Sequence, residues 1–159
     1  MREFPESDGL AMAAAVADFI PDRSAERMHR SEGEKILRLA PGRDLLASLR
    51  PLKRDQTVVA FAAETEDLEA RGRRKLELKG ADLIVVNDVG REGIGFDASE
   101  NEVLILTAAG TRELVSRRGK REVAEKIWDA FLAARTVSVQ RTGRAVSAST
   151  VHLSDTQPK

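Results

Sequence analysis

Three apolar runs dominate the pattern of hydrophobic and polar positions along the chain. They give predicted strands over Leu10–Ala17, Thr57–Ala63 and Asp82–Val86. Continuous runs of this length, bounded by polar residues or glycine, are typical of strands buried on both faces of a parallel sheet. The first run carries the weakest strand signal of the three, because it consists largely of alanine, which is a poor strand former.

The second and third strands are joined by a predicted helix from Thr65 to Lys79. Thr65 is a suitable N-cap, and the acidic residues after it would lie at the positive end of the helix dipole, where negative charge stabilises a helix. Gly80 suits the left-handed position that follows many helices. A strand, a helix and a strand with joints this short predict a right-handed βαβ unit.

The remaining segments carry shorter patterns. They predict a loop over Phe19–Gly33, a short strand over Lys35–Leu39 and a short helix over Asp44–Leu49. The two strands of a predicted hairpin are Glu102–Thr107 and Glu113–Ser116, and a final helix with one apolar face covers about Lys120–Ala134.

Together these elements predict an α/β fold, a Rossmann-like three-layer sandwich with a mostly parallel sheet. We assign residues 10–135 to this domain, residues 1–9 to a polar N-terminal extension and residues 136–159 to a disordered tail. Ligands of such folds bind at the carboxyl ends of the strands. The first candidates for a site are therefore the residue pairs that end the three strands: Asp18-Phe19, Glu64-Thr65 and Asn87-Asp88.

Charge and composition narrow the possible partners. The 159 residues include 26 basic and 26 acidic side chains, so the net charge is zero, which argues against a large nucleic-acid surface. The longest apolar run is too short to cross a bilayer, and no signal peptide is evident. Cysteine is absent, and the two histidines have no metal-ligand spacing. We expect a cytoplasmic domain without a membrane or nucleic-acid partner and without a zinc site.

Two lysines occupy an unusual position on the predicted central helix. At about 100° per residue, Leu68, Gly72 and Leu76 define the face that meets the sheet, and Lys75 and Lys79 project within the same sector. Their stems could cover the sheet edge while the ammonium groups reach water. Alternatively, two ammonium groups one turn apart could bind a polyphosphate. The pattern alone leaves both interpretations open.

Several longer motifs resemble a known family. AAAVADF (Ala13–Phe19), AFAAET (Ala60–Thr65), ARGRRKLELKGADLIVVNDV (Ala70–Val89) and GFDASENEV (Gly95–Val103) are similar to motifs of the phosphopantothenate–cysteine ligases. These enzymes form the synthetase half of the bifunctional phosphopantothenoylcysteine decarboxylase/synthetase proteins. The resemblance covers about Leu10–Ala133.

The resemblance implies a step of coenzyme A biosynthesis. Bacterial members join 4′-phosphopantothenate to cysteine: CTP activates the carboxylate as an acyl-cytidylate, pyrophosphate leaves, and the cysteine amine then displaces CMP. Mg²⁺ accompanies the nucleotide, and members form homodimers. Such a site must neutralise a triphosphate while anionic groups approach each other, so it needs cations more than a base.

The matching positions carry over the following expected roles. Ala14 would lie against the acyl-cytidylate, Phe61 would line the cytosine pocket, and Arg27 would stand in for the catalytic lysine of the mobile loop. The other nucleotide contacts are Asp18, Asp44, Leu45 and Leu46, with Lys75 and Lys79 at the triphosphate.

Two departures from the family pattern leave two hypotheses. Arg27 replaces a compact ammonium with a planar guanidinium. The glycine-rich βαβ unit that opens family members does not precede AAAVADF here, which implies an N-terminally truncated fold. The chain is therefore either a CTP-dependent ligase, acting as a homodimer or with a complementing chain, or a nucleotide-binding fragment or interaction module without ligase activity.

Overall fold

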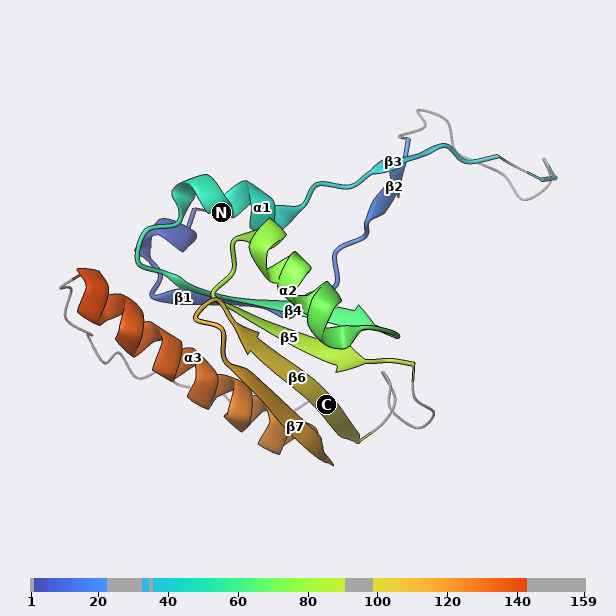
Figure 1. The fold of residues 1–159 in the computed structure, drawn as a ribbon. Helices are drawn as coiled ribbons and strands as arrows, with labels where there is room; N and C mark the ends of the chain where they lie inside the picture. The colour runs from blue at the N-terminus through green and yellow to red at the C-terminus, as the bar shows by residue number, and fades with distance from the viewer. Residues whose placement is uncertain (1, 23–32, 35, 91–98, 143–159) are drawn as a thin grey trace, which may run out of the picture.

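A five-stranded sheet forms the centre of the protein (Figure 1). The computed structural model describes residues 2–22, 33–34, 36–90 and 99–142. The strands lie in the order β1, β4, β5, β6 and β7, with the bounds Gly9–Met12, Thr57–Glu64, Leu83–Asp88, Glu100–Thr107 and Arg112–Gly119. Strands β1, β4 and β5 are parallel, whereas β6 and β7 continue the sheet as an antiparallel hairpin.

Helices cover both faces of this sheet, which gives three layers (Figure 1). Helices α1 (Leu45–Leu49) and α2 (Leu68–Lys79) lie on one face, and α3 (Lys120–Thr142) lies on the other. Successive residues of a strand point to opposite faces, so each strand contributes to two cores. The predicted Rossmann-like three-layer α/β fold is confirmed.

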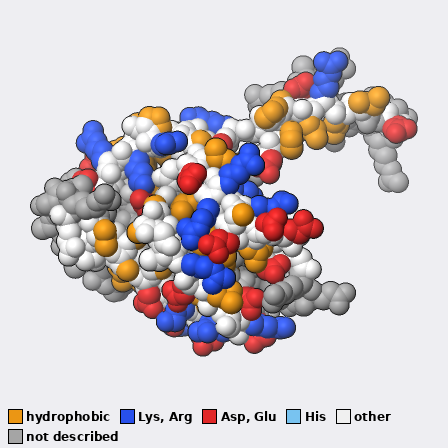
Figure 2. Space-filling model, viewed as in Figure 1, with side chains coloured by type: hydrophobic (Ala, Val, Ile, Leu, Met, Phe, Trp, Pro, Cys, Tyr) orange, Lys and Arg blue, Asp and Glu red, His pale blue; other side chains and the backbone are white. Residues whose placement is uncertain are grey.

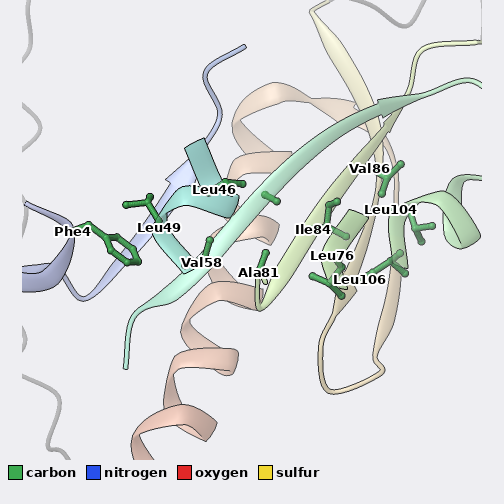
Figure 3. Packing of buried hydrophobic residues seen from close by; sticks show 11 residues of the cluster. Phe4, Leu46, Leu49, Val58, Leu76, Ala81, Ile84, Val86, Leu104 and Leu106 are labelled. Carbon is green, nitrogen blue, oxygen red and sulfur yellow. The ribbon is translucent and has the colours of Figure 1, made fainter. Parts of the chain in front are cut away.

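The core under α1 and α2 is built from alternate residues of the strands (Figure 3). It includes Val58, Ala60, Ile84 and Val86 from β4 and β5, packed against Leu46, Leu49 and Leu76 from the helices. The core under α3 uses the intervening residues Val59, Leu83 and Val85 with Val123 and Phe131. Val59, Leu83, Ile84 and Val86 are almost wholly buried, as expected for strands covered on both faces.

The predicted βαβ unit is present as β4, α2 and β5. Gly80 caps α2 in the left-handed conformation at φ 60°, as predicted. The N-terminal boundary was wrong, because Asp67 rather than Thr65 is the N-cap and the helix begins at Leu68. Strand β4 continues to Glu64, whose carbonyl accepts a hydrogen bond from the backbone N–H of Val89 at 3.0 Å. Because the strand is longer than predicted, the residues after Glu64 form the turn into α2 rather than its first turn.

The first strand is shorter than predicted. It ends at Met12, which pairs with Ala60, and the alanine-rich segment over residues 13–17 is exposed irregular chain. Among the described strands β1 has a neighbour only on the β4 side, so this alanine-rich segment gains little from continuing the ladder.

A separate antiparallel ribbon replaces the loop and strand predicted over Phe19–Gly33 and Lys35–Leu39. Strand β2 (Phe19–Pro21) pairs with β3 (Leu39–Pro41), and this ribbon projects away from the main sheet (Figure 1). The backbone N–H of Gly42 donates to the carbonyl of Asp18 at 2.7 Å and anchors the ribbon's base. Of the predicted strand over 35–39, only Leu39 is in the ladder; Lys35 lies outside the described residues.

Both predicted boundaries of the domain need adjustment. Residues 4–6 form the 3-10 helix η1, and Phe4 is buried in the core although residues 1–9 were expected to be a polar extension. Buried Gln56 holds this turn by donating to the carbonyls of Phe4 and Pro5. Helix α3 continues to Thr142, so residues 136–142 are helical where a disordered tail was predicted. The rest of that tail lies outside the described residues.

The short helix and the hairpin were predicted correctly. The short helix is α1, followed by the 3-10 helix η3 (Arg50–Leu52), and the hairpin is formed by β6 and β7. No helix within the described part of the chain is long and apolar enough to cross a membrane.

Candidate functional site

Lys75 contacts a buried carboxylate at the carboxyl end of β4. Its Nζ lies 2.6 Å from Oε1 of Glu64, in an ion pair whose angles do not meet those of a hydrogen bond. The Glu64 side chain is 7% exposed and that of Lys75 is 42% exposed, so the carboxylate is interior and the ammonium faces solvent. Glu64 is opposite Asp88 in the β4–β5 register, and both side chains are buried.

Lys79 contacts the segment that precedes α1. Its Nζ donates to Oδ2 of Asp44 at 3.4 Å, which joins the last turn of α2 to the first turn of α1. The structure therefore brings together two residues that the family resemblance assigned to the nucleotide. Each of the two predicted lysines therefore has a carboxylate partner.

Asp44 is also the N-cap of α1. Its Oδ1 accepts a hydrogen bond from the backbone N–H of Ala47 at 3.0 Å. This backbone hydrogen bond is the largest cause that holds the pKa of Asp44 below its ordinary value. Burial opposes it, and the positive charge of Lys79 lowers the pKa further. Asp44 therefore stays ionised to a lower pH than an ordinary aspartate does.

Leu45 and Leu46 follow Asp44 and differ in exposure. Leu45 is partly buried beside the cavity under α1, and Leu46 is 6% exposed in the core. Because the side chain of Leu46 packs inward, a ligand at this turn would meet its backbone.

Arg71 is a cation of this face that sequence reasoning missed. Its Nη1 lies 3.8 Å from Oε2 of Glu64, and its Nη2 lies 3.7 Å from Oε2 of Glu66. Arg71, Lys75 and Lys79 recur every fourth residue and so form one stripe along α2. Figure 2 shows basic side chains interspersed with acidic ones over this face. The four-residue spacing was visible in the sequence and could have identified Arg71.

Asp18 and Ala14 lie in the exposed segment between β1 and β2. The hydrogen bond from Gly42 to the Asp18 carbonyl brings this segment next to the turn that carries Asp44. The two parts of the expected nucleotide site thus come from β1 and α1, and they meet near the carboxyl end of the sheet.

Phe61 lies on the opposite face of the sheet from the two lysines. It is partly buried against the core under α3. Asn87 is on the same face, two residues beyond the register partner of Phe61, and its Oδ1 is buried without a hydrogen-bond partner among the described residues. A ligand that contacts both Phe61 and Lys75 would have to extend across the carboxyl edge of the sheet.

Arg27, the expected stand-in for the loop lysine, lies outside the described residues. Within the described ranges, no three carboxylate or histidine side chains converge as a protein-built metal site would require. The described site thus consists of charge pairs at the end of β4 and at the N-cap of α1.

Comparison with known proteins identifies the relatives of this domain. The family model described as DFP, the DNA/pantothenate metabolism flavoprotein C-terminal domain, matches residues 1–134. The coenzyme A biosynthesis bifunctional protein CoaBC of Bacillus subtilis is 38% identical over 125 residues, which are 78% of this chain and 31% of that protein. The chain thus spans less than half the length of this curated relative.

Solved structures show the same arrangement of elements. The C-terminal domain of a coenzyme A biosynthesis bifunctional protein CoaBC superposes with a TM-score of 0.62 at 25% identity, covering 90% of this chain and 59% of that one. A Cab2 mutant in complex with phosphopantothenate-cysteine gives a TM-score of 0.62 at 18% identity, covering 83% of this chain and 45% of that one, and shares the fold.

The sheet, its two helical layers and the charged strand ends define an α/β domain of the Rossmann-like class. Within that class, the chain belongs to the family of the DNA/pantothenate metabolism flavoprotein C-terminal domain.

Proposed function

We propose that this chain carries the nucleotide-binding part of a CTP-dependent ligase that joins 4′-phosphopantothenate to cysteine in coenzyme A biosynthesis. The observation that carries the proposal is the row of cations on α2. Within this row, Lys75 contacts Glu64 at the end of β4, and Lys79 contacts Asp44, the N-cap of α1. The name of the CoaBC relative and the ligand of the Cab2 structure support the same pathway.

The proposed chemistry suits such a row. The phosphopantothenate carboxylate attacks the α-phosphorus of CTP, the bond to the β-phosphate oxygen breaks, and pyrophosphate leaves. The cysteine amine then attacks the acyl carbon and CMP departs. Charge develops on phosphate oxygens in the first step, where Lys75 and Lys79 stabilise it. Asp44 and Glu64 hold the two ammonium groups in place before the nucleotide arrives.

Mg²⁺ would enter this site with the nucleotide. Magnesium in nucleotide sites is usually held by substrate phosphates and one or two carboxylates, with water completing its shell. Asp18 and Asp44 are the exposed carboxylates beside the proposed phosphate position, so they fit such a partial role. The nucleotide phosphates and water would supply most of the ligands of the metal ion.

Assembly is the second part of the proposal. The β2–β3 ribbon exposes Phe19, Ile20 and Leu39, each at least half exposed, and the ribbon is prominent in Figure 2. A lone two-stranded ribbon is marginally stable, so a second copy of the chain is the partner we propose for it. Sedimentation should give a dimer, and Ile20→Lys should shift it towards monomer.

A complementing chain would use a different surface. Strand β1 is an edge strand beside a cavity of about 270 Å³ lined by Phe4, Leu10, Met12 and Leu49 among others. An added parallel strand would pair with β1 and cover this apolar lining. Such a strand would come from the parts of the relatives that this chain does not match.

The alternative function is nucleotide binding without ligation, which is suggested because the expected site residues that the structure describes are those assigned to the nucleotide. One experiment separates the two. Purified protein is incubated with phosphopantothenate, cysteine and CTP, pyrophosphate is measured, and thermal unfolding is followed with and without CTP. A working ligase releases pyrophosphate, and Lys75→Ala abolishes the release.

The binding module instead gives a CTP-dependent shift of the unfolding temperature without pyrophosphate. Absence of both signals would refute both functions. Arg74→Ala is the matched control, because Arg74 is exposed on the same helix and lies off the cation stripe.

A further inference from the structure

We propose that Arg71 is a third anion-binding side chain, which extends the phosphate site by one helical turn beyond Lys75 towards the carboxyl ends of the strands. This inference rests on the proposed function, since it concerns the same nucleotide.

The first argument is position. Arg71 precedes Lys75 by four residues, and Lys79 follows by four, so the three side chains lie on one stripe of α2. Helix α2 begins just after β4 ends, which places Arg71 nearer than either lysine to the strand ends where ligands of such sheets bind.

The second argument is the shared carboxylate. Glu64 is contacted through Oε1 by Lys75 at 2.6 Å and through Oε2 by Arg71 at 3.8 Å. Its side chain is only 7% exposed, so the protein interior fixes its position. A fixed carboxylate between two cations sets their spacing, and the two cations then present neighbouring positive groups to the solvent side.

The third argument is the hydrogen-bonding capacity that Arg71 leaves unused among the described residues. Its two ion-pair distances, 3.8 and 3.7 Å, exceed hydrogen-bond length, and its side chain makes no hydrogen bond to the described residues. The side chain is 51% exposed. A planar guanidinium in this state can bind two oxygens of a phosphate at once, which the lysine ammonium groups cannot do with the same geometry.

The competing explanation is purely structural: Arg71 would only neutralise Glu64 and Glu66 at the surface. The two explanations differ in phosphate dependence. A residue that binds the terminal phosphates matters for CTP and little for CMP, whereas a structural residue affects the two nucleotides alike or not at all.

The test is calorimetric titration of CTP and CMP into the parent chain and into Arg71→Ala, Arg71→Lys, Lys75→Ala and the control Arg74→Ala. We expect Arg71→Ala to raise the Kd for CTP about tenfold, as loss of a charge-assisted contact does, and that for CMP by less than about twofold. Arg71→Lys should recover part of the CTP affinity and should bind measurably even where the alanine variant is poorly folded.

Equal Kd values for CTP in Arg71→Ala and Arg74→Ala, or equal losses for CTP and CMP, would overturn the inference. If Lys75→Ala loses CTP and Arg71→Ala does not, the inference fails while the proposed function stands. If the parent chain shows no saturable CTP binding, the proposed function and the inference fail together.

Discussion

The Nζ of Lys75 lies 2.6 Å from the Oε1 of Glu64, at the point where β4 ends and the chain turns towards α2. The carboxylate is buried and the ammonium is partly exposed. A charge removed from water in this way requires a partner, so the lysine that the proposed function assigns to phosphate also stabilises the fold.

This double role makes the stability of Lys75 variants informative. Lys75→Ala should lower the free energy of unfolding by about 1 kcal/mol, since Glu64 would lose its nearest cation while Arg71 and solvent compensate in part. The double variant Lys75→Ala with Glu64→Gln should recover most of that loss, because no buried charge is then left. Urea unfolding followed by circular dichroism measures both. Strictly additive effects would contradict the coupling.

Asp44 gives a prediction about pH. Its pKa is lowered in the folded protein by the Ala47 hydrogen bond and by Lys79, so its ionised form stabilises the fold above the ordinary value of 3.8. That stabilisation is lost as the pH falls through the lower, folded pKa. Asp44→Asn keeps a good N-cap and removes the charge. Its deficit, about 0.5 kcal/mol near neutral pH as for other exposed pairs, should vanish in strong acid.

The comparison requires denaturant unfolding of both proteins across the acidic range. The difference between them should shrink as the pH falls below 3.8. A difference that is constant or grows in acid would show that the carboxylate charge is not the cause.

Gly72 should be irreplaceable on the inner face of α2. A Cβ at this position would lie 2.7 Å from Cγ2 of Val86 and 2.8 Å from Cδ1 of Leu106, both of which belong to buried side chains. Alanine normally favours a helix over glycine by about 1 kcal/mol, but overpacking here costs about 1–3 kcal/mol. We expect Gly72→Ala to lower the unfolding midpoint, whereas Glu77→Ala on the exposed side should not. A more stable Gly72→Ala protein would refute this packing argument.

The fold was predictable wherever burial and periodicity agree. The β4–α2–β5 unit followed from two apolar runs and from Gly80, whose left-handed conformation the structure retains. The failures occur where the chain leaves the core. Ile36 and Leu37 look like strand residues, but they are exposed, and the ladder forms instead at Leu39. A local apolar pattern does not indicate whether the folded protein has another surface against which those apolar residues can pack.

The site was predictable in part for the same reason. Helical spacing placed Lys75 and Lys79 on one face, and the structure keeps them there beside Glu64 and Asp44. Arg71 shares the four-residue spacing of the two lysines, but its contact with Glu64 forms only through the turn between β4 and α2 and was not predicted. The separation of Phe61 from the lysines also depends on strand alternation within the folded sheet, which the apolar run around Phe61 conceals.

That separation gives the last prediction. Phe61 and Lys79 lie on opposite faces of the sheet, so we expect them to contact different parts of the nucleotide. Phe61→Ala should weaken CTP and CMP equally, by about tenfold, because base stacking on an aromatic ring contributes about 1–3 kcal/mol and is independent of the phosphates. Lys79→Ala should weaken CTP far more than CMP. Calorimetric titration of both nucleotides gives the ratio of Kd values for each variant. If Phe61→Ala changes that ratio as Lys79→Ala does, both residues act on the phosphates, and the base lies elsewhere.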